Sequence, residues 1–149
     1  MPVDGQAVTE KRTFSRTTSV SLTIDAPPAA VWKLLTDAQH YPDWNSTIVS
    51  LKGNISPEGK LELVSTLDPS RTFKLKIKDF NPPTRLVWGD ALGQRTYTLS
   101  GTNAGQTLFE MTEKIGGPVF PLFASRIPPF DASFEQFAAD LKAAAERAA

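Results

Sequence analysis

The 149-residue sequence contains no cysteine and only one histidine, His40. Without cysteine the chain can form neither a disulfide framework nor a thiolate metal or redox centre. A lone histidine also rules out a pair of histidine metal ligands, and we expect His40 to be a solvated turn residue rather than a member of a Ser-His-Asp triad. These absences predict that the protein uses no metal and no cofactor. They also suit a reducing compartment, and the expected location is the cytoplasm.

The sequence also lacks an excess of one charge and any long hydrophobic run. Sixteen basic and sixteen acidic residues are interspersed, so no basic patch for nucleic acid is expected. No apolar run approaches the roughly 20 residues of a membrane span. The opening MPVDGQAVTEKRTFSR has no apolar core of an export signal. We therefore expect no nucleic-acid partner and no integral membrane segment, and the sequence predicts no particular oligomeric state.

The periodic part of the sequence begins near residue 17. Residues 1–16 are polar and aperiodic, which is typical of a disordered or frayed terminus. From Thr18 onward, Val20, Leu22 and Ile24 alternate with polar residues, as in a half-buried strand. The 149-residue chain is 40% hydrophobic, and residues 17–149 have the length of one domain. We expect a single domain over that range.

The last stretch of the chain, residues 130–148, predicts a long helix. Phe134, Phe137, Leu141 and Ala145 recur at intervals of three and four, which places them in one stripe. Such a helix is roughly 28 Å long. A stripe of this length and aromatic content requires a broad apolar surface, and the rest of the chain is expected to provide it.

That surface is predicted to be an antiparallel sheet. After the first strand come a short amphipathic helix at 29–37 and an aromatic corner, YPDWN, that forms a second helical turn. Six further strands separated by turn residues are expected at 48–51, 61–67, 73–80, 86–91, 96–101 and 107–115. Short connections make neighbouring strands antiparallel. Residues 116–129 contain four prolines and predict an irregular apolar connector or lid. The fold class is α+β, with a curved sheet of about seven strands around the last helix.

Several strands show which side chains face inward. Phe73 and Leu75 alternate with lysines, so the two apolar residues should face the core. By the same alternation Tyr97 shares a face with Leu99. For the strand RLVWGDA, the alternation does not decide whether Trp88 or its neighbours face the core.

Glu113 is the acidic residue whose placement matters most. It alternates with Phe109 and Met111 and should share their inward face, where an unpaired charge would be costly. Arg95, in register with Tyr97, is a candidate partner. A surface pair at the ends of the strands is the simpler interpretation. Glu113, Arg95 and Tyr97 are the candidates for any catalytic role.

Two segments carry a resemblance to a known family. SLTIDAPPAAVWKLLTDAQHYPDWN, with its Ala-Pro turn, Val-Trp, Leu-Leu-Thr-Asp and Tyr-Pro-x-Trp-Asn, resembles the opening of the START-like, or helix-grip (SRPBCC), superfamily, in particular its polyketide cyclase/dehydrase branch. Gly116-Gly117 after Glu113, and the Leu-Lys of the last helix, resemble the end of that fold. The resemblance covers residues 18–148. It implies a ligand cavity between the sheet and the C-terminal helix.

The number of large apolar side chains also favours a pocket, because they exceed what one helix stripe fills. The expected ligand-binding residues are Phe73, Leu75, Trp88, Tyr97, Phe109, Met111, Phe120, Phe123, Phe130 and Phe134.

Three functions are compatible with this reading. The first is binding of a small hydrophobic or amphipathic molecule, such as a lipid, polyketide, isoprenoid or aromatic metabolite. The second is a polyketide cyclase or dehydratase acting in the same cavity. The third is an interaction or regulatory module with a filled core. The lack of a usable histidine base favours the binding protein over the enzyme.

Overall fold

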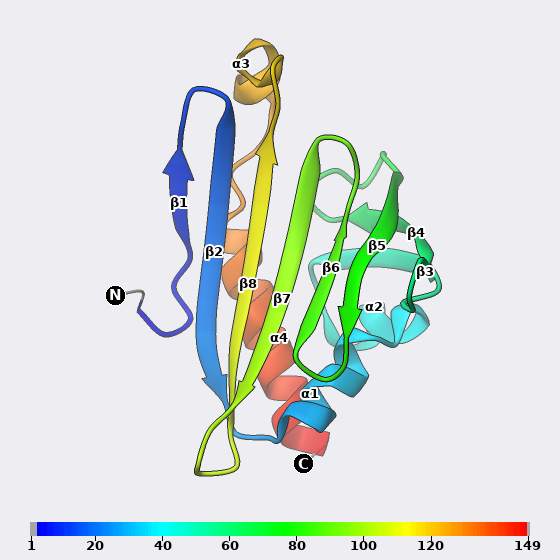
Figure 1. The fold of residues 1–149 in the computed structure, drawn as a ribbon, viewed down its shortest axis with the longest axis vertical. Coiled ribbons are helices and arrows are strands. Elements are labelled where there is room, and N and C mark those ends of the chain that lie inside the picture. The colour runs from blue at the N-terminus through cyan, green and yellow to red at the C-terminus, as the bar shows by residue number, and fades with distance from the viewer. Residues whose placement is uncertain (1–2, 149) are drawn as a thin grey trace.

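The computed structural model describes residues 3–148, in which one antiparallel sheet of eight strands packs against helices on one face (Figure 1). The strand order is β1-β2-β8-β7-β6-β5-β4-β3. The strands are β1 Val8–Lys11, β2 Ser15–Ile24, β3 Ile48–Gly53, β4 Lys60–Ser65, β5 Phe73–Asn81, β6 Arg85–Gly89, β7 Gly93–Gly101 and β8 Thr107–Gly116. The helical elements are α1 Pro28–Leu35, η1 Ala38–His40, α2 Tyr41–Trp44, α3 Phe120–Phe123, η2 Ala124–Arg126 and α4 Asp131–Ala148. The predicted α+β helix-grip architecture is confirmed.

The long helix α4 crosses the sheet behind β2, β8 and β7 (Figure 1). Its buried side chains are those of the stripe predicted from the sequence, with two further alanines: Phe134, Phe137, Ala138, Leu141, Ala144 and Ala145. The buried residues of the first turns are phenylalanines and those of the last turns are alanines. The helix therefore supplies the inner layer of the core.

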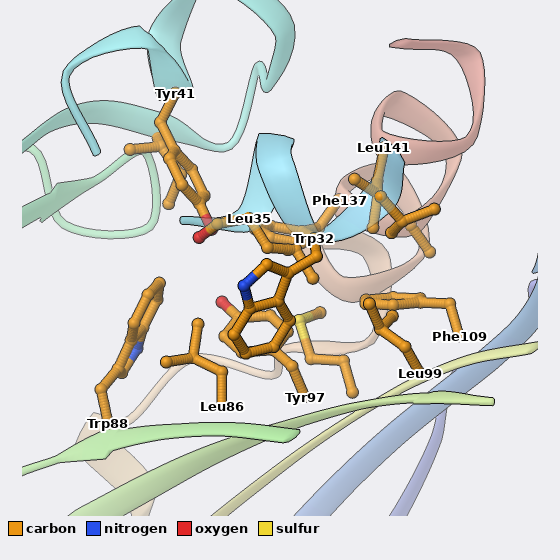
Figure 2. Close-up of a cluster of buried hydrophobic side chains, with 14 of the residues drawn as sticks. Trp32, Leu35, Tyr41, Leu86, Trp88, Tyr97, Leu99, Phe109, Phe137 and Leu141 are labelled. Atoms are coloured by element: carbon orange, nitrogen blue, oxygen red, sulfur yellow. The ribbon is translucent and has the colours of Figure 1, made fainter. Parts of the chain in front are cut away.

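Side chains fill the space between α4 and the middle of the sheet. In Figure 2, Trp88, Tyr97 and Phe109 rise from the strands toward Phe137 and Leu141 of α4. The ring centres of Tyr97 and Phe137 are 5.8 Å apart, and those of Phe109 and Phe137 are 6.5 Å apart. Leu86 and Trp88 face this core, which settles the orientation of their strand. These aromatic side chains therefore pack the space between α4 and the middle of the sheet.

The sheet bends between its two halves. Register shifts occur between Ile77 and Asp79 in β5 and between Ile48 and Ser50 in β3. Such irregularities increase the local twist and re-aim the strand. On β5 the predicted alternation holds up to the shift, with Leu75 and Ile77 buried and the lysines on either side of each exposed.

The N-terminal segment corrects one prediction. The expectation of a frayed terminus over 1–16 is wrong for β1 and for the start of β2, and for Met1 and Pro2 it lies outside the described residues. β1 pairs with β2 through its main chain, and the amide of Ala7 donates a 2.8 Å hydrogen bond to Glu135 Oε2 on α4. Because β1 is held by main-chain pairing and by contacts with α4 rather than by buried apolar side chains, its sequence shows no hydrophobic alternation. The sheet consequently has eight strands rather than about seven.

The segment between β8 and α4, residues 117–130, is called the connector below. It was expected to be irregular, but α3 and η2 give it two short helical turns at the top of the molecule in Figure 1. Each segment is a single helical turn in a proline-rich stretch, which is too short to show a helical periodicity in the sequence. No helix within residues 3–148 is long and apolar enough to cross a bilayer.

Candidate functional site

A cavity of about 250 Å³ lies at one end of the core, between the ends of strands β4–β8 and the connector. Its lining residues are Leu63, Ser65, Leu67, Asp68, Arg71, Phe73, Leu75, Trp88, Gly89, Asp90, Leu92, Gly93, Gln94, Arg95, Glu113, Ile115, Phe123, Arg126, Ile127, Pro128 and Phe130. No residue of α4 is among them. The solid core therefore displaces the expected space from beneath the helix to the segment that leads into it.

The walls of the cavity are mainly apolar because of strand alternation. The inward positions of β4 and β5 contribute Leu63, Phe73 and Leu75, and the connector contributes Phe123 and Phe130 from the opposite side. Phe130 is stacked on Phe134, with ring centres 5.9 Å apart and an interplanar angle of 6°. Phe134 thus supports a wall without forming part of it.

An ion pair lies on the floor of the cavity. Arg95 and Glu113 are partners in the pairing of β7 with β8, and Arg95 Nε donates to Glu113 Oε1 at 2.7 Å. Their side chains are only 13% and 19% exposed. The interpretation as a surface pair is therefore wrong, and the inward placement that follows from alternation is correct. Each charge compensates the other in a region where an isolated charge would be strongly unfavourable.

The Arg95 guanidinium is further held by aromatic neighbours. Its carbon lies 5.0 Å from the ring centre of Phe134 and 5.7 Å from that of Phe137, and Nη1 donates to the Tyr97 hydroxyl at 3.5 Å. Burial alone would lower the pKa of Arg95, but the charge of Glu113 and the interactions with Tyr97 together outweigh burial, and the pKa is raised. Arg95 is a permanent cation on this floor.

Tyr97 is held in its neutral form. Burial raises the pKa of Tyr97 to about 12, although the charge of Arg95 opposes the shift. A hydroxyl with such a pKa is not ionised near neutral pH. Tyr97 can orient Arg95 through a hydrogen bond, but it cannot serve as a base.

Arg16 fastens the connector over the cavity. It points inward from β2, is 8% exposed, and donates to the carbonyl oxygens of Ile127 at 3.2 Å and Pro128 at 2.8 Å. Its guanidinium carbon also lies 4.8 Å from the ring centre of Phe130. Burial lowers the pKa of Arg16, and the charges of Glu113 and Asp131 oppose this shift. The Arg16 side chain thus contacts three residues of the connector and holds them over the cavity.

Sequence reasoning missed Arg16 because it lay in the segment expected to be frayed. The signal was nevertheless present, since Arg16 and Thr18 have the same parity as the inward residues Val20, Leu22 and Ile24. Continuing the alternation two positions toward the N-terminus would have placed both polar residues inside.

The structure brings only part of the predicted site together. The predicted residues that line the cavity are Phe73, Leu75, Trp88, Phe123, Phe130, Arg95 and Glu113. Those that do not line it are Tyr97, Phe109, Met111, Phe120 and Phe134. Tyr97, Phe109 and Met111 are fully buried in the core beneath α4, and Phe120 is 3% exposed and packs against Phe123. Alternation predicts the face of a strand, whereas the distance along the strand decides between core and cavity.

At position 89 of the lining, glycine is required because another part of the backbone passes too close for a side chain. A Cβ atom on Gly89 would lie 2.3 Å from the carbonyl oxygen of Gly93, across the turn between β6 and β7. That turn is also held by Asp90, whose Oδ1 accepts hydrogen bonds of 2.9 Å from the amides of Leu92 and Gly93. The rim of the cavity on this side is therefore a rigid turn.

Neither a second, polar hollow nor His40 has the features of an enclosed binding site. A hollow of about 360 Å³ between residues 36–39 and 53–56 is polar and open to solvent, without enclosing apolar walls. His40 is exposed, as expected, and its Nδ1 lies 2.8 Å from Asp37 Oδ2. Within residues 3–148 no group of three or more histidine, aspartate or glutamate side chains is arranged to hold a metal ion.

Comparison with known proteins identifies one family. The model of the family described as polyketide cyclase / dehydrase and lipid transport matches residues 15–146. No curated protein matches the chain.

Similar solved structures share the fold. They include a protein from Nitrosomonas europaea with 15% identity and a TM-score of 0.70, covering 93% of this chain and 98% of that one. A protein from Mesorhizobium loti has 19% identity and a TM-score of 0.69, with coverage of 90% and 99%. A START superfamily protein from Mycobacterium smegmatis has 14% identity and a TM-score of 0.65, with coverage of 89% and 99%.

Proposed function

Because this chain belongs to the polyketide cyclase / dehydrase and lipid transport family, we propose that it binds a small hydrophobic or amphipathic molecule in the cavity beneath the connector. The observation that carries the proposal is a largely apolar, open cavity beside a core that is otherwise solid. Binding pockets are typically apolar concavities with a few polar groups that orient the ligand. Here those groups are Arg95 and Glu113 on the floor. We place this activity in the cytoplasm, which suits a chain without cysteine.

The volume of the cavity narrows the class of ligand. A closed apolar cavity of roughly 150 Å³ accommodates benzene, and pockets for drug-sized ligands span roughly 300–1,000 Å³. A cavity of about 250 Å³ lies between these values. It suits a molecule of up to about three rings or a short acyl chain. A longer lipid or polyketide would leave part of its length outside the mouth.

A titration with the neutral fluorescent probe N-phenyl-1-naphthylamine tests the proposal. Its emission should rise on binding. The dissociation constant should lie in the micromolar range, which corresponds to a binding free energy of about −8 kcal/mol. Leu67→Trp adds volume at a half-buried lining position and should weaken binding about tenfold or more. The matched control is Val49→Trp, at a 48% exposed position on β3 outside the lining, which should leave binding unchanged. Absence of binding by the wild-type protein, or equal effects of the two substitutions, would reject the proposal.

Enzymatic turnover is the second candidate function, and one observation favours it: the Glu113 carboxylate lines the cavity. Loss of a general acid or base typically costs about a hundredfold or more in rate. Glu113→Gln should then remove turnover of a polyketide-like substrate while leaving its affinity intact. Turnover that is unaffected by Glu113→Gln would exclude Glu113 from the chemistry. In the binding protein no turnover is expected, because the carboxylate is engaged by Arg95 at 2.7 Å.

A further inference from the structure

We propose that the ligand is an amphipathic organic anion, whose negatively charged group is held at the mouth of the cavity by Arg71 and Arg126. The inference rests on the proposed function, since it specifies the chemistry of a ligand in the same cavity. It comes from comparing the hydrogen-bonding state of the three arginines and three carboxylates that line the cavity.

The three carboxylates already have donors. Glu113 accepts from Arg95 at 2.7 Å, and Asp90 accepts from two backbone amides of its own turn. Asp68 Oδ1 accepts from the hydroxyl of Ser70 at 3.0 Å. Each of the three carboxylates therefore already has at least one hydrogen-bond donor, and Glu113 also has a neutralising charge beside it.

The two arginines at the mouth are in the opposite state. Neither the Arg71 nor the Arg126 guanidinium makes an ion pair or a side-chain hydrogen bond with any of residues 3–148. Each guanidinium offers five N–H donors in a planar arrangement that matches a carboxylate, sulfonate or phosphate. Both guanidinium groups are therefore available to donate hydrogen bonds to a ligand.

Arg71 is held through its side chain, whereas Arg126 adjoins a fastened stretch of backbone. The Arg71 guanidinium carbon lies 4.4 Å from the ring centre of Phe73, a wall residue, so the cation is stacked on the ring. Arg126 ends η2 and directly precedes the two connector residues whose carbonyl groups Arg16 holds. A stacked guanidinium and a fastened backbone restrict the freedom that an anion would otherwise have to remove on binding.

The interior and the mouth together describe the ligand. The floor arginine, Arg95, is neutralised by Glu113, so the interior offers an anionic group no uncompensated positive charge. The walls around Leu75, Trp88 and Phe130 suit an apolar body. The arrangement therefore orients the ligand with its apolar part inward and its anionic group toward Arg71 and Arg126.

A pair of probes with the same ring system tests this orientation. 8-Anilinonaphthalene-1-sulfonate carries a sulfonate that N-phenyl-1-naphthylamine lacks. We expect the wild-type protein to bind the sulfonate about tenfold more tightly, a difference of about 1.4 kcal/mol. The double variant Arg71→Gln/Arg126→Gln should lose this preference, which is measured as the ratio of the affinities for the two probes. The preference should also decrease with added salt.

The control removes the same charge elsewhere. Lys33 on α1 and Lys52 on β3 are exposed and lie outside the lining, and Lys33→Gln/Lys52→Gln should retain the preference. Loss of the preference in this control would attribute it to net charge and would overturn the inference. Near-ultraviolet dichroism of each variant should match the wild type.

The outcomes separate the inference from the proposed function. Equal affinities for the two probes would overturn the anionic ligand while leaving the cavity as a binding site. Failure of both probes to bind would reject the cavity, and the inference with it. Inorganic phosphate is the test for a free anion: if it displaces the sulfonate probe as effectively as an aryl carboxylate does, the site recognises the anion alone and the amphipathic ligand is rejected.

Discussion

Removing the negative partner of the floor ion pair should destabilise the protein markedly. In Glu113→Gln the shape of the side chain is nearly preserved, but the Arg95 cation, 13% exposed, loses its counter-charge. Breaking a buried ion pair by removing one partner typically costs about 3 to 5 kcal/mol. Partial exposure and the remaining contacts with the rings of Phe134 and Phe137 reduce this cost, so we expect about 2 to 3 kcal/mol. At this chain length the loss corresponds to a fall in Tm of about 5 to 10 °C.

A surface pair on the same sheet provides the control. Asp79 and Arg85 lie 3.1 Å apart with side chains 47% and 42% exposed, and such pairs contribute about 0 to 1 kcal/mol. The free energy of unfolding, from urea titrations of Glu113→Gln and Asp79→Asn, should therefore fall by clearly different amounts. Replacing both members of the floor pair by apolar residues, Arg95→Met/Glu113→Leu, should cost less than the sum of the two single changes. Equal losses in Glu113→Gln and Asp79→Asn would refute the description of a partly buried, coupled pair.

Three further outcomes follow from the packing. Deleting α4 should prevent folding, because it removes two fully buried phenylalanines worth about 3 to 5 kcal/mol each against a total stability of about 5 to 15; a cooperative thermal transition in the truncated chain would contradict this. Arg16→Met should release the connector, seen as faster hydrogen exchange over 117–130 with little change in β5, whereas unchanged exchange would remove Arg16 as its fastening. Tyr41 and Tyr97 should both resist ionisation in the folded protein, since burial raises the pKa of each; tyrosinate absorbance should appear near pH 10 only after unfolding in urea, and the stability from these groups should be complete below pH 10 and decrease above it.

The sheet and the long helix could be predicted because both leave a periodic pattern. The spacing of Phe134, Phe137 and Leu141 marks the buried stripe of α4, and Leu75 and Ile77 mark the inward face of β5. These patterns exist because burial of apolar area is the main driving force of folding and repeats with the geometry of the element. β1 leaves no such pattern, because main-chain pairing and contacts with α4 hold it.

The candidate site could be predicted only in part, for a geometric reason. Parity along a strand placed Glu113 and Phe109 on one face, but one lines the cavity and the other lies in the solid core under α4. Which of them meets the helix depends on where α4 begins and how the connector packs, and neither is encoded by local spacing. Likewise, the pairing of Arg95 with Glu113 follows from the register of β7 and β8. A hydrophobic pattern specifies a face more strongly than it specifies such a partner.

The most direct measurement of the central claim uses the three tryptophans as built-in reporters. Trp88 lines the cavity, whereas Trp32 and Trp44 lie outside the lining. In a ¹⁵N-labelled sample titrated with 8-anilinonaphthalene-1-sulfonate, the indole N–H resonance of Trp88 should shift progressively and saturate, because the bound rings lie against it. The resonances of Trp32 and Trp44 should remain in place. Saturation without a shift at Trp88, or larger shifts at Trp32 or Trp44, would contradict binding in the cavity beneath the connector.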